Sequence, residues 1–282
     1  MPELPEVETV RQGLNKLTLG KEIQGGDVLL NRTIAYPFSA AEFLAGVKNV
    51  SITNWHRYGK YLLAELTNSD KSQAGWLGVH LRMTGQLLWL NQEDLLQKHT
   101  RVRLFFPNNY ELRFVDTRTF GKIWWVPPSN PPESIITGLQ KLGPDPFSAE
   151  FSVEYLVGKL HKRQRAIKTA LLDQSLIAGV GNIYADEALF LSGIRPEILC
   201  AALNLEQIFR LRTAIIEVLQ KSIEAGGTTF SDFISVMGIN GNYGGSAWVY
   251  GRTGEPCRVC GTSIDKLKLA GRSSHFCPKC QH

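Results

Sequence analysis

The chain has 282 residues, of which 43% are hydrophobic and 20% are charged. This length predicts two or three domains, and this composition is typical of a folded globular protein rather than a disordered or fibrous one. The net charge of +5 suits a polyanionic partner without establishing one. The N-terminal region carries Glu3, Glu6 and Glu8 and no long apolar run, which argues against a secretory signal, and no stretch is long enough to span a membrane. We therefore expect a cytoplasmic protein without a membrane partner.

The N-terminus reads MPELPEVETV. A small second residue favours removal of the initiator methionine, and the new terminus would be the ring nitrogen of Pro2, a secondary amine beside Glu3. Taken alone, the stretch is more typical of a helix start, because proline is tolerated in a first turn. The apolar residues that come next have the three-four spacing of one helix face: Leu4, Val7, Val10, Leu14 and Leu17. Both interpretations remain open at this point.

Short alternating runs rich in Val, Ile, Leu, Phe and Trp occupy residues 26–126 and predict β-strands. Asn108 and Asn109 separate two of these runs as a hairpin turn would, and residues 68–74 are typical of a longer polar loop. The proline-dense stretch WVPPSNPPES at residues 125–134 is typical of an interdomain connection. We expect the first domain to end there.

Helical patterns dominate the next part of the chain, at residues 155–160, 167–172, 183–191 and 205–223. The last helix is expected to end at Gly226 and Gly227. Between the second and third, the run LLDQSLIAGVGNIYADEALF predicts a turn after Asp173 and a new helix capped by Asn182. Glycines in this turn allow backbone N–H groups to approach an anion closely.

The segment HKRQRAIK, upstream of that turn, is strongly basic. Its basic side chains are His161, Lys162, Arg163, Arg165 and Lys168. Such a run is either a solvated helix face or a contact to a nucleic-acid backbone. A glycine-lined helix start beside it favours nucleic acid as the partner.

Four of the five cysteines form two Cys-x-x-Cys pairs near the C-terminus: Cys257, Cys260, Cys277 and Cys280. Two such pairs across a hairpin predict one tetrahedral Zn²⁺ site. Because all four positions are thiolates, the ion is expected to be structural, with no open position for water. Between the pairs, Arg272 is expected at the end of the hairpin far from the metal. It is either a solvated surface arginine or a bidentate phosphate contact.

At this point the motifs resemble one family over essentially the whole chain, the bacterial formamidopyrimidine-DNA glycosylases, which repair oxidised purines. The motifs that carry the resemblance are PELPEVET, RYGKYL, HLRMTGQL, DTRTFGK, GVGNIYADEALF and GRSSHFCPKC. A sister family, endonuclease VIII, is similar in plan but favours oxidised pyrimidines. It typically opens with Glu-Gly-Pro-Glu, where this chain has Glu-Leu-Pro-Glu.

The resemblance implies a multidomain α+β fold. It implies an N-terminal β-sandwich with an N-terminal helix over residues 1–132, a helix-two-turn-helix DNA-binding domain with a lesion-capping loop over residues 133–246, and a β-hairpin zinc finger over residues 247–282. It also implies a monomer that holds one structural Zn²⁺ and binds double-stranded DNA carrying an oxidised purine or an abasic site, in a bacterial cytoplasm at the nucleoid.

The resemblance also implies roles for single residues. The implied catalytic residues are Pro2, Glu3, Lys60 and Arg272. The residues implied to fill the gap left by a flipped base are Met83, Arg118 and Phe120. The implied phosphate contacts are His99, Arg163, Lys168, Asn182 and Arg272. From the residues alone, Lys60 is more typical of a surface lysine at a strand end, and Met83 and Phe120 are more typical of core residues.

The implied activity is that of a bifunctional DNA glycosylase and abasic-site lyase. The Pro2 amine would form a Schiff base with the damaged nucleotide, and β,δ-elimination would cut the strand. Two alternatives stay open: an endonuclease VIII-like enzyme for oxidised pyrimidines, and a non-catalytic protein that binds damaged DNA. Contacts of the capping loop, Met237–Gly245, to the flipped base are not implied residue by residue, so lesion preference is the least defined expectation.

Overall fold

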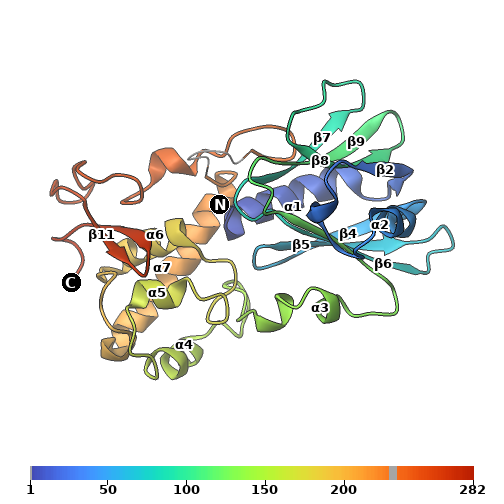
Figure 1. Cartoon of the computed structure of the whole chain (residues 1–282). Coiled ribbons are helices and arrows are strands. Elements are labelled where there is room, and N and C mark those ends of the chain that lie inside the picture. The colour runs from blue at the N-terminus through green and yellow to red at the C-terminus, as the bar shows by residue number, and fades with distance from the viewer. Residues whose placement is uncertain (1, 229–233) are drawn as a thin grey trace. The chain divides into compact units, whose positions relative to one another are not determined.

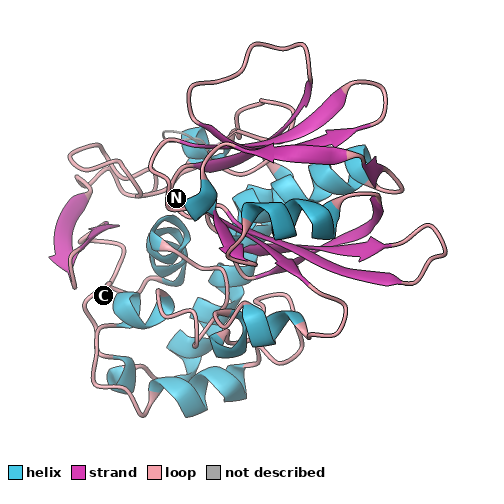
Figure 2. Cartoon of the chain, turned by 45° about the vertical axis from the view of Figure 1, so that its right-hand side comes forward, coloured by secondary structure: helices cyan, strands magenta, loops and turns pink. Residues whose placement is uncertain are grey.

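The computed structural model describes residues 2–228 and 234–282. The chain forms two compact units (Figure 1). Unit 1 comprises the chain up to Lys141 together with Gly226–Asn242, and unit 2 comprises Leu142–Ala225 together with Tyr243–His282. Strands dominate unit 1, whereas unit 2 is helical with one C-terminal hairpin (Figure 2). The predicted α+β class is confirmed, and the three-domain division remains a prediction.

Unit 1 is a sandwich of two sheets. The six-stranded sheet has the order β1-β4-β5-β6-β10-β3 and the four-stranded sheet the order β2-β8-β9-β7. The first sheet is built from β1 (Glu22–Ile23), β3 (Ile34–Tyr36), β4 (Val50–Tyr58), β5 (Tyr61–Thr67), β6 (Gln73–His80) and β10 (Lys122–Val126). The second is built from β2 (Gly25–Val28), β7 (Gly85–Asn91), β8 (Thr100–Phe106) and β9 (Tyr110–Asp116). Alternate burial along β8 reflects one face in the core and one outside.

The N-terminal helix α1 (Leu4–Thr18) packs its apolar face into the same core. Val7, Val10 and Leu14 are fully buried there with residues of both sheets, as the three-four spacing predicts. The Trp55 indole of β4 donates a hydrogen bond to Thr18 Oγ1 at 2.9 Å, which fixes the far end of the helix. The predicted hairpin turn is also confirmed: Asn108 and Asn109 both have positive φ, which asparagine tolerates.

Helix α2 (Ala40–Val47) was not predicted within the strand-rich region. The Ser39 side chain caps it by accepting from the Glu42 N–H at 3.3 Å. A Cβ atom at Gly46 would lie 2.3 Å from Trp125 Cδ2, so glycine is required for this helix to pack on β10. Two short helical segments, α3 (Pro132–Ile135) and η2 (Leu139–Lys141), and η1 (Asn31–Thr33) complete the unit.

Unit 2 contains the remaining helices. They are α4 (Val153–Leu160), α5 (Ile167–Leu171), α6 (Asn182–Ser192), η3 (Cys200–Ala202), α7 (Leu205–Glu224) and η4 (Tyr243–Ser246). The hairpin consists of β11 (Asp265–Leu269) and β12 (Arg272–Phe276). Helix α7 ends before Gly226 and Gly227, both with positive φ, as predicted. Among the described helices, none combines the length and the apolar character that crossing a bilayer requires.

Candidate functional site

The start of α1 is held by a buried carboxylate. Glu6 accepts a hydrogen bond from the Glu3 backbone N–H at 2.8 Å and another from the Thr228 N–H at 2.8 Å. Glu3 and Glu6 are both almost completely buried. Pro2 therefore stands next to the positive end of a helix whose first turn is fixed on two sides.

Lys60 lies in the tight turn between β4 and β5, three residues after an arginine that contacts α1. Arg57 Nε is 3.0 Å from Glu8 Oε2, and this ion pair is about nine-tenths buried. Lys60 itself is only 7% exposed. The sequence-based interpretation of Lys60 as a surface lysine is therefore wrong.

His80 is a neighbour of Lys60 that was not singled out in the sequence. It ends β6 and pairs with Tyr61, the residue after Lys60, and the two rings meet edge-on at 4.5 Å. Burial, and then the charges of Arg82 and Lys60, lower the pKa of His80 to about 3. The imidazole is thus neutral at physiological pH. Because Nδ1 accepts from the Arg82 N–H at 3.0 Å, the ring proton is on Nε2, which is a donor.

Two loops of unit 1 are joined by Asp116, a buried aspartate at the end of β9. Its Oδ1 accepts from Thr84 Oγ1 at 2.5 Å and from the Arg118 N–H at 3.2 Å, and its Oδ2 accepts from the Gly121 N–H at 2.8 Å. The carboxylate thereby ties the β6–β7 loop to the β9–β10 loop. A Cβ atom at Gly121 would lie 2.4 Å from Phe114 Cζ, so this close approach needs glycine.

The three predicted gap-filling residues sit on these two loops. Met83 is half-buried on the first, and Arg118 and Phe120 are exposed on the second. The Arg118 guanidinium lies over the Phe120 ring, 5.0 Å from its centroid. The structure thus brings Met83, Arg118 and Phe120 to one end of the sandwich. An exposed Phe120 contradicts its interpretation as a core residue.

His99 belongs to the same end of the sandwich. Its carbonyl oxygen accepts from the Asp116 N–H at 2.9 Å, and its Nδ1 lies 3.1 Å from Arg101 Nη2. The ring is half-buried. The backbone of His99 is therefore fixed to that of Asp116, the residue whose carboxylate joins the two loops.

In unit 2, the basic run is organised by Asp173, which comes after α5. Asp173 Oδ2 is 3.1 Å from Arg163 Nη1 and 2.6 Å from Arg165 Nη2, while Oδ1 accepts from the Ser175 N–H at 3.0 Å. Partial burial raises the pKa of Asp173, but the hydrogen bonds from Ser175 and Arg165 outweigh it, so the pKa lies well below its usual range. Arg163 is thus fixed at the start of the turn.

The turn itself is closed by one amide side chain. Gln174 Oε1 accepts from the Gly179 N–H at 2.9 Å, and Gln174 Nε2 donates to the Val180 carbonyl at 2.8 Å. Gly179 has a positive φ of 91°, as a tight approach requires. Helix α6 begins at Asn182 with Gly181 as its N-cap, so the prediction that Asn182 caps the helix is wrong by one position. The Asn182 Nδ2 instead donates to the Ser273 carbonyl at 3.1 Å.

The structure corrects the placement of Lys168. A phosphate contact requires an accessible ammonium group, but the Lys168 side chain is completely buried and forms an ion pair with Asp186 of α6. It also donates to the Asn182 carbonyl at 3.2 Å. Lys168 therefore joins α5 to α6 from the inside and cannot reach a phosphate in this arrangement.

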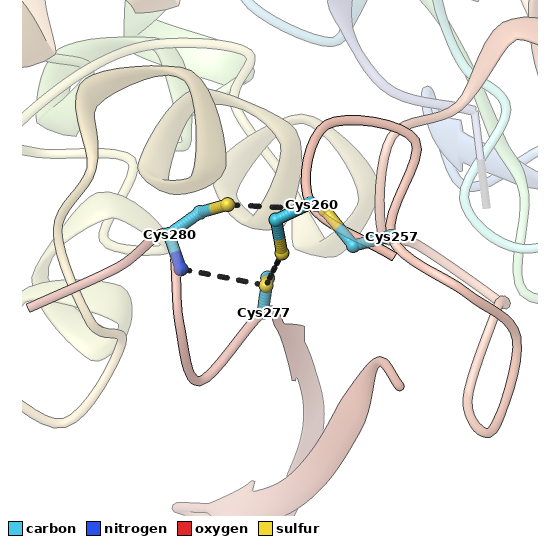
Figure 3. A group of neighbouring side chains, drawn as sticks. All are labelled: Cys257, Cys260, Cys277 and Cys280. Carbon is cyan, nitrogen blue, oxygen red and sulfur yellow. Dashed lines mark hydrogen bonds between the residues drawn. The ribbon is translucent and has the colours of Figure 1, made fainter. Parts of the chain in front are cut away.

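The four predicted zinc ligands meet at the base of the hairpin (Figure 3). Their Sγ atoms all lie within 4.8 Å of one another, with 3.9 Å between Cys257 and Cys280 and 3.5 Å between Cys260 and Cys277. Four sulfurs about 2.3 Å from one Zn²⁺ form a tetrahedron with edges of about 3.8 Å. These separations are too long for disulfides and fit one tetrahedral ion. Arg272, at the opposite end of β12 from Cys277, is exposed as predicted.

The fold and the site define the class of helix-two-turn-helix DNA glycosylases with a zinc finger. Three features carry this conclusion: a β-sandwich with a buried lysine, a helix-turn-helix pair with a basic edge, and a four-cysteine hairpin. Comparison with known families supports this class over most of the chain. Residues 1–123 match the formamidopyrimidine-DNA glycosylase N-terminal domain, residues 142–234 its H2TH domain, and residues 254–282 the zinc finger found in FPG and IleRS. The chain belongs to the formamidopyrimidine-DNA glycosylase family, as its motifs predicted.

Individual relatives agree with this assignment. A formamidopyrimidine-DNA glycosylase of Nostoc punctiforme is 71% identical over 281 residues, covering 100% of this chain and 96% of the relative. Another, from Nostoc sp., is 68% identical over 282 residues and covers 100% of both chains. Among solved structures, the Lactococcus lactis FPG mutant G226P in complex with a Fapy-dG containing DNA is 35% identical with a TM-score of 0.89, covering 100% of both chains. MutM in complex with carbocyclic 8-oxo-G containing DNA is 36% identical with a TM-score of 0.88, also covering 100% of both chains.

Several supporting residues were missed from the sequence because their roles depend on three-dimensional contacts. They are Glu6, His80, Asp116, Asp186 and Glu187. His80 and Asp116 lie inside HLRMTGQL and DTRTFGK, two motifs that carry the family resemblance. Their position in these motifs was the sequence signal that could have identified them. Glu187 is fully buried and accepts from the N–H groups of residues 248–250. Burial raises its pKa more than these hydrogen bonds lower it.

Proposed function

We propose that Pro2 is the nucleophile of a bifunctional enzyme that excises oxidised purines from duplex DNA and then cuts the strand at the abasic site. The chain is an oxidised-purine DNA glycosylase of base excision repair. The observation that carries the assignment of Pro2 is its place immediately before Glu3, the N-cap of α1, where Glu3 and Glu6 are buried. Removal of Met1 makes this residue a secondary amine.

The amine must be neutral to attack. A terminal amine titrates at about 7.7 to 8.0, and the positive end of α1 lowers this pKa further. The Pro2 nitrogen forms a bond to C1′ of the damaged nucleotide while the glycosidic bond breaks, and the proton that the nitrogen loses is taken up by the departing base. Opening of the C1′–O4′ bond then gives an iminium ion, and O4′ takes up a proton, for which we assign Glu3 as the donor.

The secondary amine also determines the strand-cutting step. The iminium nitrogen carries no hydrogen, so the ion cannot become a neutral imine by losing a proton and stays cationic. The positive charge acidifies C2′, and loss of a C2′ proton expels the 3′ phosphate. A second elimination expels the 5′ phosphate. One nucleophile thereby serves both the glycosylase step and the lyase step.

Lys60 and His80 are assigned to the phosphates next to the reacting sugar. Lys60 supplies a cation held in a nearly buried turn, and the neutral His80 supplies an Nε2–H donor on the adjacent strand. A cation and a neutral donor together bind a phosphate without placing a second positive charge beside Lys60.

Base extraction is assigned to the two loops joined by Asp116. Flipping a base costs a few kcal/mol in stacking and pairing, so the vacated space must be filled. We assign Met83 to that space, Phe120 to a wedge beside it and Arg118 to the orphaned cytosine. In unit 2, Arg163, Asn182 and Arg272 are assigned as phosphate contacts, and in unit 1 His99 has the same role.

The zinc ion holds the hairpin and takes no part in the chemistry. The four cysteines would bind one Zn²⁺ with no open position, and in short modules such binding contributes about 10 to 16 kcal/mol. The hairpin would present Arg272 at the end opposite the metal. We further propose that the enzyme acts as a monomer in the bacterial cytoplasm, with functional domains at residues 1–132, 133–246 and 247–282.

Borohydride trapping tests this function, because reduction of the iminium makes the Schiff base permanent. A duplex with one 8-oxoguanine opposite cytosine should give a covalent adduct, and a duplex with an oxidised pyrimidine should give much less. Pro2→Gly replaces the secondary terminal amine with a primary one and should trap more slowly. Stronger trapping on the oxidised pyrimidine would indicate the sister specificity, and no adduct on either duplex would indicate a non-catalytic binder.

A further inference from the structure

One face of helix α6 carries the zinc hairpin. Asn182, Asp186 and Phe190 succeed one another at four-residue intervals, so their side chains lie along one side of the helix. The Asn182 amide bonds the Ser273 carbonyl at 3.1 Å. Phe190 stacks on Trp248 with 5.6 Å between ring centroids and belongs to the same buried cluster as Cys257 and Cys277.

Asp186, in the middle of this face, uses both of its oxygens. Its Oδ2 accepts from the backbone N–H of His275 and lies 3.0 Å from His275 Nδ1, so the ring proton is on that nitrogen. Its Oδ1 pairs with Lys168 Nζ. Asp186 and Lys168 are completely buried, and His275 is nearly so. The carboxylate therefore connects α5, α6 and β12 at one point.

The contact to β12 fixes the position of Arg272. Strand β12 has five residues, and Arg272 is the first of them, directly after the turn at Ala270 and Gly271. Ser273 and His275, which α6 holds, lie one and three residues further along the same strand. A slip of one residue would move Arg272 by about 3.3 Å, which is more than a hydrogen bond tolerates.

We propose that Asp186 is a positioning residue for the reaction: through His275 it sets the register of the hairpin on α6 and so the placement of the Arg272 guanidinium. The proposal rests on the assigned role of Arg272 as a phosphate contact. Zinc organises the base of the hairpin, and Asp186 fixes its position against the helix. The two functions are separable, because the Asp186 carboxylate binds Lys168 and His275 while the zinc site is built from the four cysteines.

A double-mutant cycle tests the proposal. In Asp186→Asn, an NH₂ group must face either the Lys168 ammonium or the His275 N–H. Arg272→Ala removes the guanidinium alone. Affinity for a duplex carrying a tetrahydrofuran abasic analogue should fall about tenfold in each single variant. The double variant should bind about as weakly as Arg272→Ala, because both changes remove the same contact.

Two further measurements distinguish a change in the position of β12 from a general loss of protein stability. Zinc content should stay at one ion per chain in Asp186→Asn, while hydrogen exchange of the β12 amides should accelerate about tenfold in the DNA-free protein. Tyr184→Phe, on the same helix, loses a buried hydrogen bond to Ser222 at 2.5 Å and is the matched control. It should leave β12 exchange and DNA affinity unchanged.

A milder variant keeps the test valid if Asp186→Asn does not fold. His275→Phe retains the Lys168–Asp186 pair and the backbone bond, and it should weaken binding about threefold with β12 exchange raised. Multiplicative effects of Asp186→Asn and Arg272→Ala, or β12 exchange equal to that of the native protein, would overturn the proposal. Native affinity in Arg272→Ala would instead refute the assigned role of Arg272, whatever happens to β12 exchange.

Discussion

Two buried aspartates hold the segments that we assign to DNA contact, one in each unit, and their surroundings differ. Asp116 in unit 1 accepts from one hydroxyl and two backbone N–H groups and joins two loops. Asp186 in unit 2 pairs with the Lys168 ammonium and joins helices to a hairpin. Hydrogen bonds from neutral donors can be removed one at a time, whereas removing either partner of a buried ion pair leaves an unpaired buried charge. We therefore expect substitutions around Asp116 to destabilise unit 1 in small steps, and substitutions of Asp186 or Lys168 to destabilise unit 2 in one large step.

The largest effect is expected from Lys168→Met. Removing one partner of a buried ion pair leaves an uncompensated charge and costs about 3–5 kcal/mol. Unit 2 should therefore unfold at a markedly lower denaturant concentration, and the further change Asp186→Leu should recover part of the loss. Denaturant unfolding monitored by fluorescence measures both.

The same variant tests whether Lys168 is a buried partner of Asp186 rather than a phosphate contact. If this lysine contacted a phosphate, Lys168→Met would leave stability unchanged and reduce the slope of log affinity against log salt by about 1. The matched control is Arg163→Gln, which should reduce that slope by about 1 without a large loss of stability. Native stability in Lys168→Met would contradict the burial seen here.

Cys257→Ser is expected to have the next largest effect, confined to the hairpin. Loss of one thiolate weakens a site that contributes about 10–16 kcal/mol to small modules. DNA affinity should fall about tenfold or more because Arg272 is no longer held, while zinc content drops. Cys200→Ala, outside the four-cysteine cluster, is the control and should retain its zinc. Native affinity in the zinc-depleted variant would show that the hairpin is dispensable.

Asp116→Asn should give a smaller and more selective loss. Each unsatisfied buried donor costs about 1–3 kcal/mol, so the two loops should loosen without unfolding the sandwich. Excision from duplex DNA should slow about tenfold or more, because Met83, Arg118 and Phe120 no longer fill the gap together. Trapping on a single-stranded abasic oligonucleotide, which needs no base flipping, should change little.

Thr84→Val removes only one of the donors to Asp116 and should slow excision by less than Asp116→Asn. Equal losses on duplex and single-stranded substrates in Asp116→Asn would show that this carboxylate supports the reacting centre rather than the two loops.

The buried, neutral His80 predicts that the free energy of unfolding depends on pH. The folded protein binds a proton at His80 only near pH 3, whereas the unfolded chain binds it near pH 6.5. Between these values the unfolded state carries more protons, so stability falls as pH falls, by up to about 1.4 kcal/mol per pH unit. In His80→Gln, the fall in stability between pH 7 and pH 5 should be smaller. A histidine NMR signal of His80 that titrates near pH 6.5 would contradict the neutral assignment.

The sequence predicted the features that depend on local pattern. The helix face of α1, the turn at Asn108 and Asn109, and the zinc ligands were all readable because spacing alone determines them. Helix α2 was missed because its packing requires Gly46 to accommodate Trp125, which is distant in the sequence but adjacent in the fold.

The sequence-based interpretations of Lys168, Lys60 and Phe120 were wrong for one physical reason. Lys168 belongs to a basic run, and nothing in the run distinguishes the lysine that meets Asp186 in the interior from arginines that stay at the surface. Lys60 and Phe120 were misjudged in opposite directions, since motif position says nothing about burial. The family resemblance selected the right segments, but only contacts between distant segments show which side chains are accessible.

The central claim is that the Pro2 nitrogen bonds to the sugar, and mapping the trapped adduct tests it most directly. The complex reduced by borohydride on an 8-oxoguanine duplex would be digested, and the nucleotide-bearing peptide identified by mass spectrometry. We predict a peptide that begins at Pro2, lacks Met1 and carries the sugar fragment on its terminal nitrogen. A sugar fragment on Lys60, or a fully active protein that retains Met1, would contradict the account.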